Sequence, residues 1–254
     1  MQYAVRAAQT AVGFSNKGIN KSIWHSVAVQ FQTLDGKSQM PVSQYLKCKD
    51  LTPGQYDGGD MTGAPVIQLP NENALANYTK YFYLEDAWDT VNKKEVEGWA
   101  NDAGDLVTDE DVVTLGKAFW FRSFQNGGEV NSAGAVINGD TATVTVKPTV
   151  WQMIANPFPM PGNLATLITT GLTPGEYDGG DMTGAPQLQI PNENALANYT
   201  KYFYLEDAWD TVNKKEVEGW ANDAGDLVTS DDKMPLARGA WYKGATGGTL
   251  TFVK

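Results

Sequence analysis

The sequence predicts an all-β protein built as two tandem antiparallel β-sandwich (or barrel-like) domains. The main observation is an internal repeat: residues 51–108 match residues 172–229 at 54 of 58 positions, at an offset of 121 residues. A period this long exceeds that of solenoid repeats, so each copy is expected to fold around its own core. We expect copy 1 over residues 1–131, with an extended N-terminal arm over 1–11, and copy 2 over 132–254. The near-identity of the copies indicates an internal duplication.

The second observation is a succession of short segments rich in aromatic and β-branched residues, which favour strands. Gly, Asn and Asp separate them, as is typical of antiparallel sandwiches and barrels. Residues 86–97 lack the apolar stripe of an amphipathic helix, so no helix is expected there. Besides a strand near Trp24, we expect strands at 78–84, 118–121, 150–155, 240–243 and 249–253.

Turn signals complete the pattern. Residues 141–146 alternate polar with apolar side chains, and Asn138-Gly139 supplies the positive φ of a type I′ turn before them. We therefore expect residues 133–137 and 141–146 to form a β-hairpin. Gly127-Gly128 and Gly247-Gly248 are likewise expected to be hairpin turns before the last strand of each copy.

Composition excludes several functions. The 254 residues contain one Cys and one His, which excludes an internal disulfide and a zinc site built from several thiolates. A His-dependent catalytic site would have to use His25, which we expect to be a partly buried strand residue. The net charge of −11 disfavours nucleic acid, whose phosphates require clustered Lys and Arg. We expect a protein that is not an enzyme.

Charge is unevenly distributed along the chain. Residues 1–50 carry six basic and two acidic side chains, whereas 51–108 carry three basic and ten acidic ones and 172–229 three and eleven. A basic leading segment followed by two acidic repeats suits head-to-tail association of identical subunits. The expected partner is therefore another copy of the chain, in a homo-oligomer, filament or lattice.

Copy 2 opens and closes on recognisable motifs. Residues 151–159 read W-Q-M-I-A-N-P-F-P, and residues 239–252 contain G-A-W-Y-K and G-G-T-L-T-F. This order resembles the NPFP/GxFW-type β-sandwich repeat module of secreted bacterial cell-surface proteins. The resemblance implies a β-sandwich used in extracellular assemblies and brings no catalytic residues with it. Copy 1 departs from the motif, because Val29-Gln30-Phe31-Gln32 replaces N-P-F-P.

Two acidic loops recur in both copies and are candidate calcium sites. Each places two carboxylates around Gly-Gly or Ala-Gly, and Ca²⁺ prefers six to eight oxygen ligands. Asp and Gly are also ordinary turn residues, and neither loop fits the EF-hand spacing, so both interpretations stay open. The candidate ligands are Asp57, Asp60, Asp102, Asp105, Asp178, Asp181, Asp223 and Asp226.

Aromatic side chains of the repeat are candidates for stacking on sugar rings. Strand alternation places Tyr81 and Tyr83 on one face, with Phe82 opposite. The alternative is that these rings pack in the core, since Trp and Tyr contribute much of the burial in small sandwiches. The candidate residues are Tyr81, Tyr83, Trp88, Trp99, Tyr202, Tyr204, Trp209 and Trp220.

These observations predict a non-enzymatic structural subunit that assembles head to tail into an extracellular filament or surface layer. The alternative is a tandem carbohydrate-binding or adhesin module, in which two sites gain avidity. We expect no membrane span. The first residues carry no secretory leader, so the chain is either cytoplasmic or a mature form whose leader has been removed. The resemblance implies the second alternative, with a location outside the cell or at its surface.

Overall fold

The computed structural model describes residues 11–72, 77–192 and 198–254. As predicted, it is all-β. We call the part up to Ala135 the first half and the part after it the second half. The elements of the first half are β1 (Val12–Ile19), β2 (His25–Ala28), β3 (Gln39–Pro41), the short helix α1 (Val42–Tyr45), β4 (Leu46–Lys49), β5 (Val66–Pro70), β6 (Tyr78–Asp89), β7 (Lys94–Ala100), β8 (Val112–Thr114), β9 (Ala118–Arg122) and β10 (Gly128–Ala135).

The second half repeats this succession, with a 3₁₀ turn in place of the short helix. Its elements are β11 (Thr141–Val146), β12 (Gln152–Ala155), β13 (Gly162–Asn163), the 3₁₀ turn η1 (Leu164–Thr166), β14 (Ile168–Thr170), β15 (Gln187–Pro191), β16 (Tyr199–Asp210), β17 (Lys215–Ala221), β18 (Lys233–Met234), β19 (Gly239–Lys243) and β20 (Gly248–Val253).

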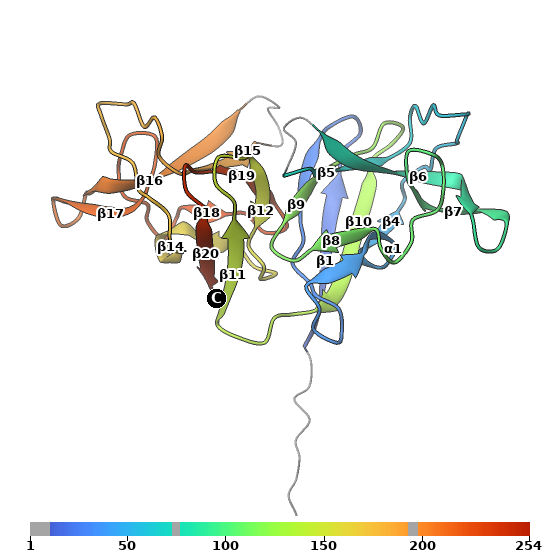
Figure 1. The fold of residues 1–254 in the computed structure, drawn as a ribbon, viewed down its shortest axis with the longest axis horizontal. Helices are drawn as coiled ribbons and strands as arrows, with labels where there is room; N and C mark the ends of the chain where they lie inside the picture. The colour runs from blue at the N-terminus through green and yellow to red at the C-terminus, as the bar shows by residue number, and fades with distance from the viewer. Residues whose placement is uncertain (1–10, 73–76, 193–197) are drawn as a thin grey trace, which may run out of the picture.

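Within the described residues, each half contains a five-stranded sheet, a three-stranded sheet and a two-stranded ribbon. In the first half their strand orders are β2-β9-β5-β6-β7, β1-β10-β4 and β3-β8. The second half has the corresponding orders β12-β19-β15-β16-β17, β11-β20-β14 and β13-β18. The two halves lie side by side in Figure 1, the first running from blue to the yellow-green of β10 and the second from β11 onward to red.

Each half has its own main core between its larger sheets, in a β-sandwich-like arrangement. Strand alternation decides which side chains enter it: Phe119 and Phe121 of β9 point inward, whereas Trp120 lies on the opposite face. Burying such a side chain stabilises the fold by about 1.5–3 kcal/mol. Core residues include Phe31, Ile67, Trp99, Phe119 and Phe121 in the first half and Phe158, Leu188, Trp220, Ala240 and Tyr242 in the second.

The predicted hairpin between residues 133–137 and 141–146 is wrong. Strand β11 has the predicted bounds, but it pairs with β20, and β10 pairs with β1 and β4. Because β10 has a neighbour on each side, it has no free edge to offer β11. The Asn138-Gly139 segment therefore connects two sheets that belong to different halves.

The two Gly-Gly pairs are also not hairpin turns. Gly127-Gly128 leads from β9 in the five-stranded sheet to β10 in the three-stranded sheet, and Gly247-Gly248 does the same in the second half. A Cβ on Gly128 would lie 2.6 Å from the Lys49 carbonyl oxygen, and one on Gly248 would lie 2.3 Å from that of Thr170. Glycine is needed here because the crossing chain approaches another backbone closely.

The boundary between the halves also differs from the predicted one, because of strand β10. This strand crosses the predicted boundary between residues 131 and 132 and pairs with β1 along its length, ending with Ala135 opposite Val12. The chain therefore passes from one core to the other within residues 136–140. The predicted extended arm over 1–11 lies outside the described residues, apart from Ala11.

Among the described residues, no helix is long and apolar enough to cross a membrane. His25 is buried in β2, where its Nε2 accepts a hydrogen bond from the Asn20 backbone N–H at 3.0 Å. His25 is therefore a strand residue, as predicted, but it is fully buried and not partly buried. Cys48 lies in β4 as a free thiol, and burial raises its pKa above the ordinary value.

Candidate functional site

The five-stranded sheets of the two halves meet near their edge strands β2 and β12. The Ala28 N–H donates to the Ala237 carbonyl at 3.2 Å, and the Ala155 N–H donates to the Gly116 carbonyl at 2.8 Å. Ala28 corresponds to Ala155 in the repeat, and Gly116 corresponds to Ala237. The same bond is therefore made in both directions, as in a two-fold dimer interface, but within one chain.

Small side chains allow the halves to approach closely. Ala28, Ala118, Met153 and Ala155 form a buried cluster against which Trp120 and Trp241 pack. Gly239 occupies the position that Ala118 holds in the first half. A Cβ on Gly239 would lie 2.1 Å from the Ala118 Cβ, so alanine at both positions would force the two halves to shift.

Gln30 makes a contact that breaks this symmetry. Its buried side-chain amide donates to the carbonyls of Phe158 at 2.6 Å and Asn156 at 3.3 Å, which belong to the N-P-F-P segment of the second half. That segment is held by Asn156, whose side chain accepts from the Phe158 N–H and donates to the Met160 carbonyl. The departure of copy 1 from the motif thus serves the contact between the halves.

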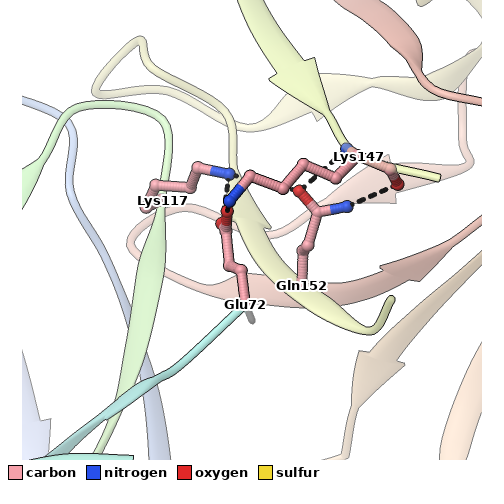
Figure 2. A network of polar contacts seen from close by, with 4 residues as sticks. All are labelled: Glu72, Lys117, Lys147 and Gln152. Atoms are coloured by element: carbon pink, nitrogen blue, oxygen red, sulfur yellow. Dashed lines mark hydrogen bonds and ion pairs between the residues drawn. The ribbon is translucent and has the colours of Figure 1, made fainter. Parts of the chain in front are cut away.

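A polar network lies beside this contact (Figure 2). Glu72 accepts from Lys117 at 2.5 Å and pairs with Lys147 of the second half at 3.2 Å. Gln152 accepts from the Lys147 N–H and donates to the Lys147 carbonyl. Although burial alone would raise the pKa of Glu72, the two lysines hold it below its usual value. The carboxylate therefore stays charged and links the halves.

An aromatic groove crosses the junction on the outer face of the two five-stranded sheets. It is lined by partly exposed side chains in four corresponding pairs. The Trp120 and Trp241 ring centroids are 6.5 Å apart, and those of Trp151 and Trp241 are 6.4 Å apart. We define the groove by Trp24, Gln68, Tyr78 and Trp120 of the first half and Trp151, Gln189, Tyr199 and Trp241 of the second.

The groove consists of two adjoining hollows. The larger, of about 440 Å³, lies between the segment 70–72 with Asn77 and Tyr78 on one side and Trp151, Tyr199 and Trp241 on the other. The smaller, of about 330 Å³, is lined by Trp24, Gln68 and Trp120 and shares Tyr78, Tyr199 and Trp241 with the larger. Each is large enough for a small-molecule ligand.

The groove presents uncharged polar groups together with aromatic rings. Burial, and then the proximity of Tyr199, raises the pKa of Tyr78, so its hydroxyl stays protonated near neutral pH. The Arg122 guanidinium lies 5.6 Å from the Trp24 ring centroid, and the corresponding Lys243 ammonium lies 5.7 Å from that of Trp151. These cation–π contacts help to orient the two outer indoles.

The aromatic residues that the sequence suggested for sugar stacking do not form a platform. Trp99 and Trp220 are 3% exposed, and Tyr81, Tyr202 and Tyr204 are also buried, so these rings belong to the cores. Tyr83 is partly buried, packs against the first core and donates its hydroxyl to Glu97. Trp88 and Trp209 are each 40% exposed but are not among the lining residues of the groove.

The calcium candidates lie in tight turns. The backbones of Asp57 and Asp60 pair with each other, and so do those of Asp178 and Asp181. Asp102, Asp105, Asp223 and Asp226 lie in turns held by Asn101 and Asn222, whose side chains accept backbone N–H groups. Among the residues that the structure describes, no three His, Cys, Asp or Glu side chains form a group that could hold a metal ion. Calcium binding stays a prediction.

The sequence did not assign the groove tryptophans to a site. Trp24 and Trp120 correspond to Trp151 and Trp241 in the repeat. Each of the four lies in a strand or immediately before one, next to core residues, and this position is the feature of the sequence that could have pointed to the site. Consecutive residues of the A-F-W-F-R segment of β9 point to opposite faces of the strand, and both faces carry aromatic rings. The sequence therefore does not tell which face is buried.

Comparison with models of protein families, with curated proteins and with solved structures finds no match for this chain.

Proposed function

We propose that the protein is a non-enzymatic carbohydrate-binding protein that holds a glycan in the aromatic groove between its halves. The observation that carries the proposal is the set of four corresponding pairs of Trp, Tyr and Gln side chains that line the groove. An extracellular or cell-surface location would expose the groove to polysaccharides, and we include that location in the proposal.

The chemistry of the lining favours sugars over other ligands. Partly exposed indole and phenol rings offer flat apolar surfaces to the C–H faces of a pyranose, while amide and hydroxyl groups can bond its hydroxyls. Glu72 lines the larger hollow, but its charge is compensated by Lys117 and Lys147. A neutral ligand with apolar faces and polar edges is therefore the best match.

Substitution of the outer indoles tests the proposal. We expect Trp24→Ala and Trp151→Ala each to weaken retention on polysaccharide by about tenfold or more, as loss of an aromatic anchor does at binding sites. Trp88→Ala is the matched control, because this indole is exposed but lies outside the groove. Binding is measured by affinity electrophoresis against a panel of neutral polysaccharides and by glycan array.

Three results would contradict the proposal. One is the absence of binding to any glycan. Another is binding that Trp88→Ala abolishes while Trp24→Ala and Trp151→Ala leave it intact. The third is preferential binding of a proline-rich peptide, a ligand that aromatic grooves also accept.

Self-assembly into a filament is a second proposal, supported by strand β1. This is an edge strand of the described three-stranded sheet, and its Val12 and Phe14 are 68% and 66% exposed. An exposed apolar edge is a template for pairing with another chain. The two equivalent faces at the junction, by contrast, are already occupied by each other.

Electron microscopy of the wild-type protein and of Phe14→Lys tests this second proposal. We expect filaments or lattices that the charge on β1 disrupts, because a charged edge strand resists pairing. Val91→Lys is the control, since Val91 is 84% exposed at the β6–β7 turn, away from β1. Monomers across salt, Ca²⁺ and pH conditions, or equal effects of the two variants, would count against assembly through β1.

A further inference from the structure

The aromatic groove continues into a hollow on each side. In the first half a hollow of about 530 Å³ shares Trp24 and Gln68 with the groove. In the second half a hollow of about 540 Å³ shares Gln189 and Tyr199 with it. Four hollows therefore adjoin one another through common side chains, and together they form one track across both halves.

The two ends of the track carry the same chemistry. Each end has an aromatic ring, a thioether, an ammonium group and a carboxylate that correspond at the repeat offset. Lys80 and Lys201 come from β6 and β16, whose neighbouring Tyr78 and Tyr199 line the groove itself. The corresponding pairs at the ends are Gly59 and Gly180, Met61 and Met182, Lys80 and Lys201, Phe82 and Phe203, and Asp102 and Asp223.

We infer that the ligand is an extended, neutral glycan chain that lies along the whole track and is bound by both halves at once. The linkage that we assign is β-1,4, because it gives an extended chain whose flat faces can stack on the aromatic rings of the track. This inference rests on the proposed function. Each hollow alone has the volume of a site for one small ligand, whereas a row of four suits a polymer. Strands β5, β6 and β9 and their counterparts supply a sheet face on which an extended chain can lie, with aromatic rings at the centre and hydrogen-bonding side chains at the ends.

Chain length is the test. We use isothermal titration calorimetry of the full protein with cellobiose, cellotetraose and cellohexaose. Affinity is expected to rise with length and to be at least about tenfold higher for cellohexaose than for cellobiose, because linked units bind at high effective concentration.

Variants at the ends of the track distinguish a ligand that spans the whole track from one that is bound only at its centre. Lys80→Ala and Lys201→Ala should each weaken cellohexaose binding about two- to tenfold, as expected for one lost hydrogen bond, and leave cellobiose binding unchanged. Lys94→Ala is the control, because Lys94 is an exposed lysine of β7 that does not line the track.

The outcomes distinguish the inference from the proposed function. Equal affinities for cellobiose and cellohexaose, or equal losses of both ligands in the Lys80 and Lys201 variants, overturn spanning and leave glycan binding standing. Binding to other polysaccharides without any cello-oligosaccharide binding overturns the β-1,4 class. Absence of binding to every glycan in the panel overturns the proposed function, and the inference with it.

Discussion

At the residue scale, Gln30 distinguishes the two copies. It stands where the second half has Pro157, which has neither an N–H nor a side-chain amide. The Gln30 N–H donates to the Tyr45 hydroxyl at 3.0 Å, and that hydroxyl donates to the Ala28 carbonyl at 2.9 Å. Its amide reaches the other half. One substitution between the copies thus supplies a bridge that two identical copies would lack.

We predict that Gln30→Ala lowers the free energy of unfolding by about 1–3 kcal/mol, because it removes the donor of two buried carbonyls. Urea unfolding followed by tryptophan fluorescence measures the change. Gln32→Ala is the control, since Gln32 is two residues further along and less buried. Equal effects of the two variants would contradict the assigned role of Gln30.

At the scale of the elements, strands β9 and β19 contribute both to the cores and to the groove. Their inward side chains complete the cores, and their outward indoles, Trp120 and Trp241, lie in the groove. Their first residues, Ala118 and Gly239, meet where the halves touch. Packing at this contact therefore determines how closely the two indoles approach.

We predict that Gly239→Ala destabilises the protein by about 1–3 kcal/mol through overpacking against Ala118. Denaturant unfolding measures the loss, and the same variant should weaken glycan retention by displacing Trp241. Gly18→Ala in β1 is the control, because a Cβ there meets nothing within 4 Å. A Gly239→Ala variant as stable as Gly18→Ala would show that the interface can relax.

At the scale of the whole molecule, the halves form a closed pair inside one chain. Reciprocal backbone bonds, the cluster around Ala118 and the bridge from Gln30 all join them. The groove is lined from both sides, so it exists only while the halves are docked. Glu72 and Lys147 add an ion pair across the junction, whose strength depends on the charge of the carboxylate.

We predict that Glu72→Gln costs about 1 kcal/mol of stability at neutral pH, the value of a favourable ion pair. In the folded state Lys117 and Lys147 hold the pKa of Glu72 below its value in the unfolded chain. The contribution is therefore complete above the unfolded pKa and is lost as the pH falls through the folded one. Denaturant unfolding of both proteins at several pH values should show the difference disappearing in acid. Glu95→Gln, an exposed β7 variant, should show no such pattern.

Much of the fold could be predicted from local pattern. Strand β11 has the predicted bounds, and strand alternation correctly separated Tyr81 from Phe82. The sugar-stacking candidates that prove to be buried, such as Tyr81 and Tyr202, were misassigned because a period of two defines two faces without telling which is buried, and both faces of β6 and β9 carry aromatic rings. The hairpin failed for a related reason: a local turn signal does not tell which strands already have partners.

The sequence alone determined the all-β class, the two similar halves and the uneven charge, because composition, repeat and alternation are properties of the chain itself. Only the tertiary structure decided the docking of the halves. That docking depends on contacts between residues more than a hundred positions apart, such as Gln30 with Phe158. It brought together four tryptophans, two within strands and two immediately before strands, in one groove, because a site shared by two sheets exists only once the sheets have met.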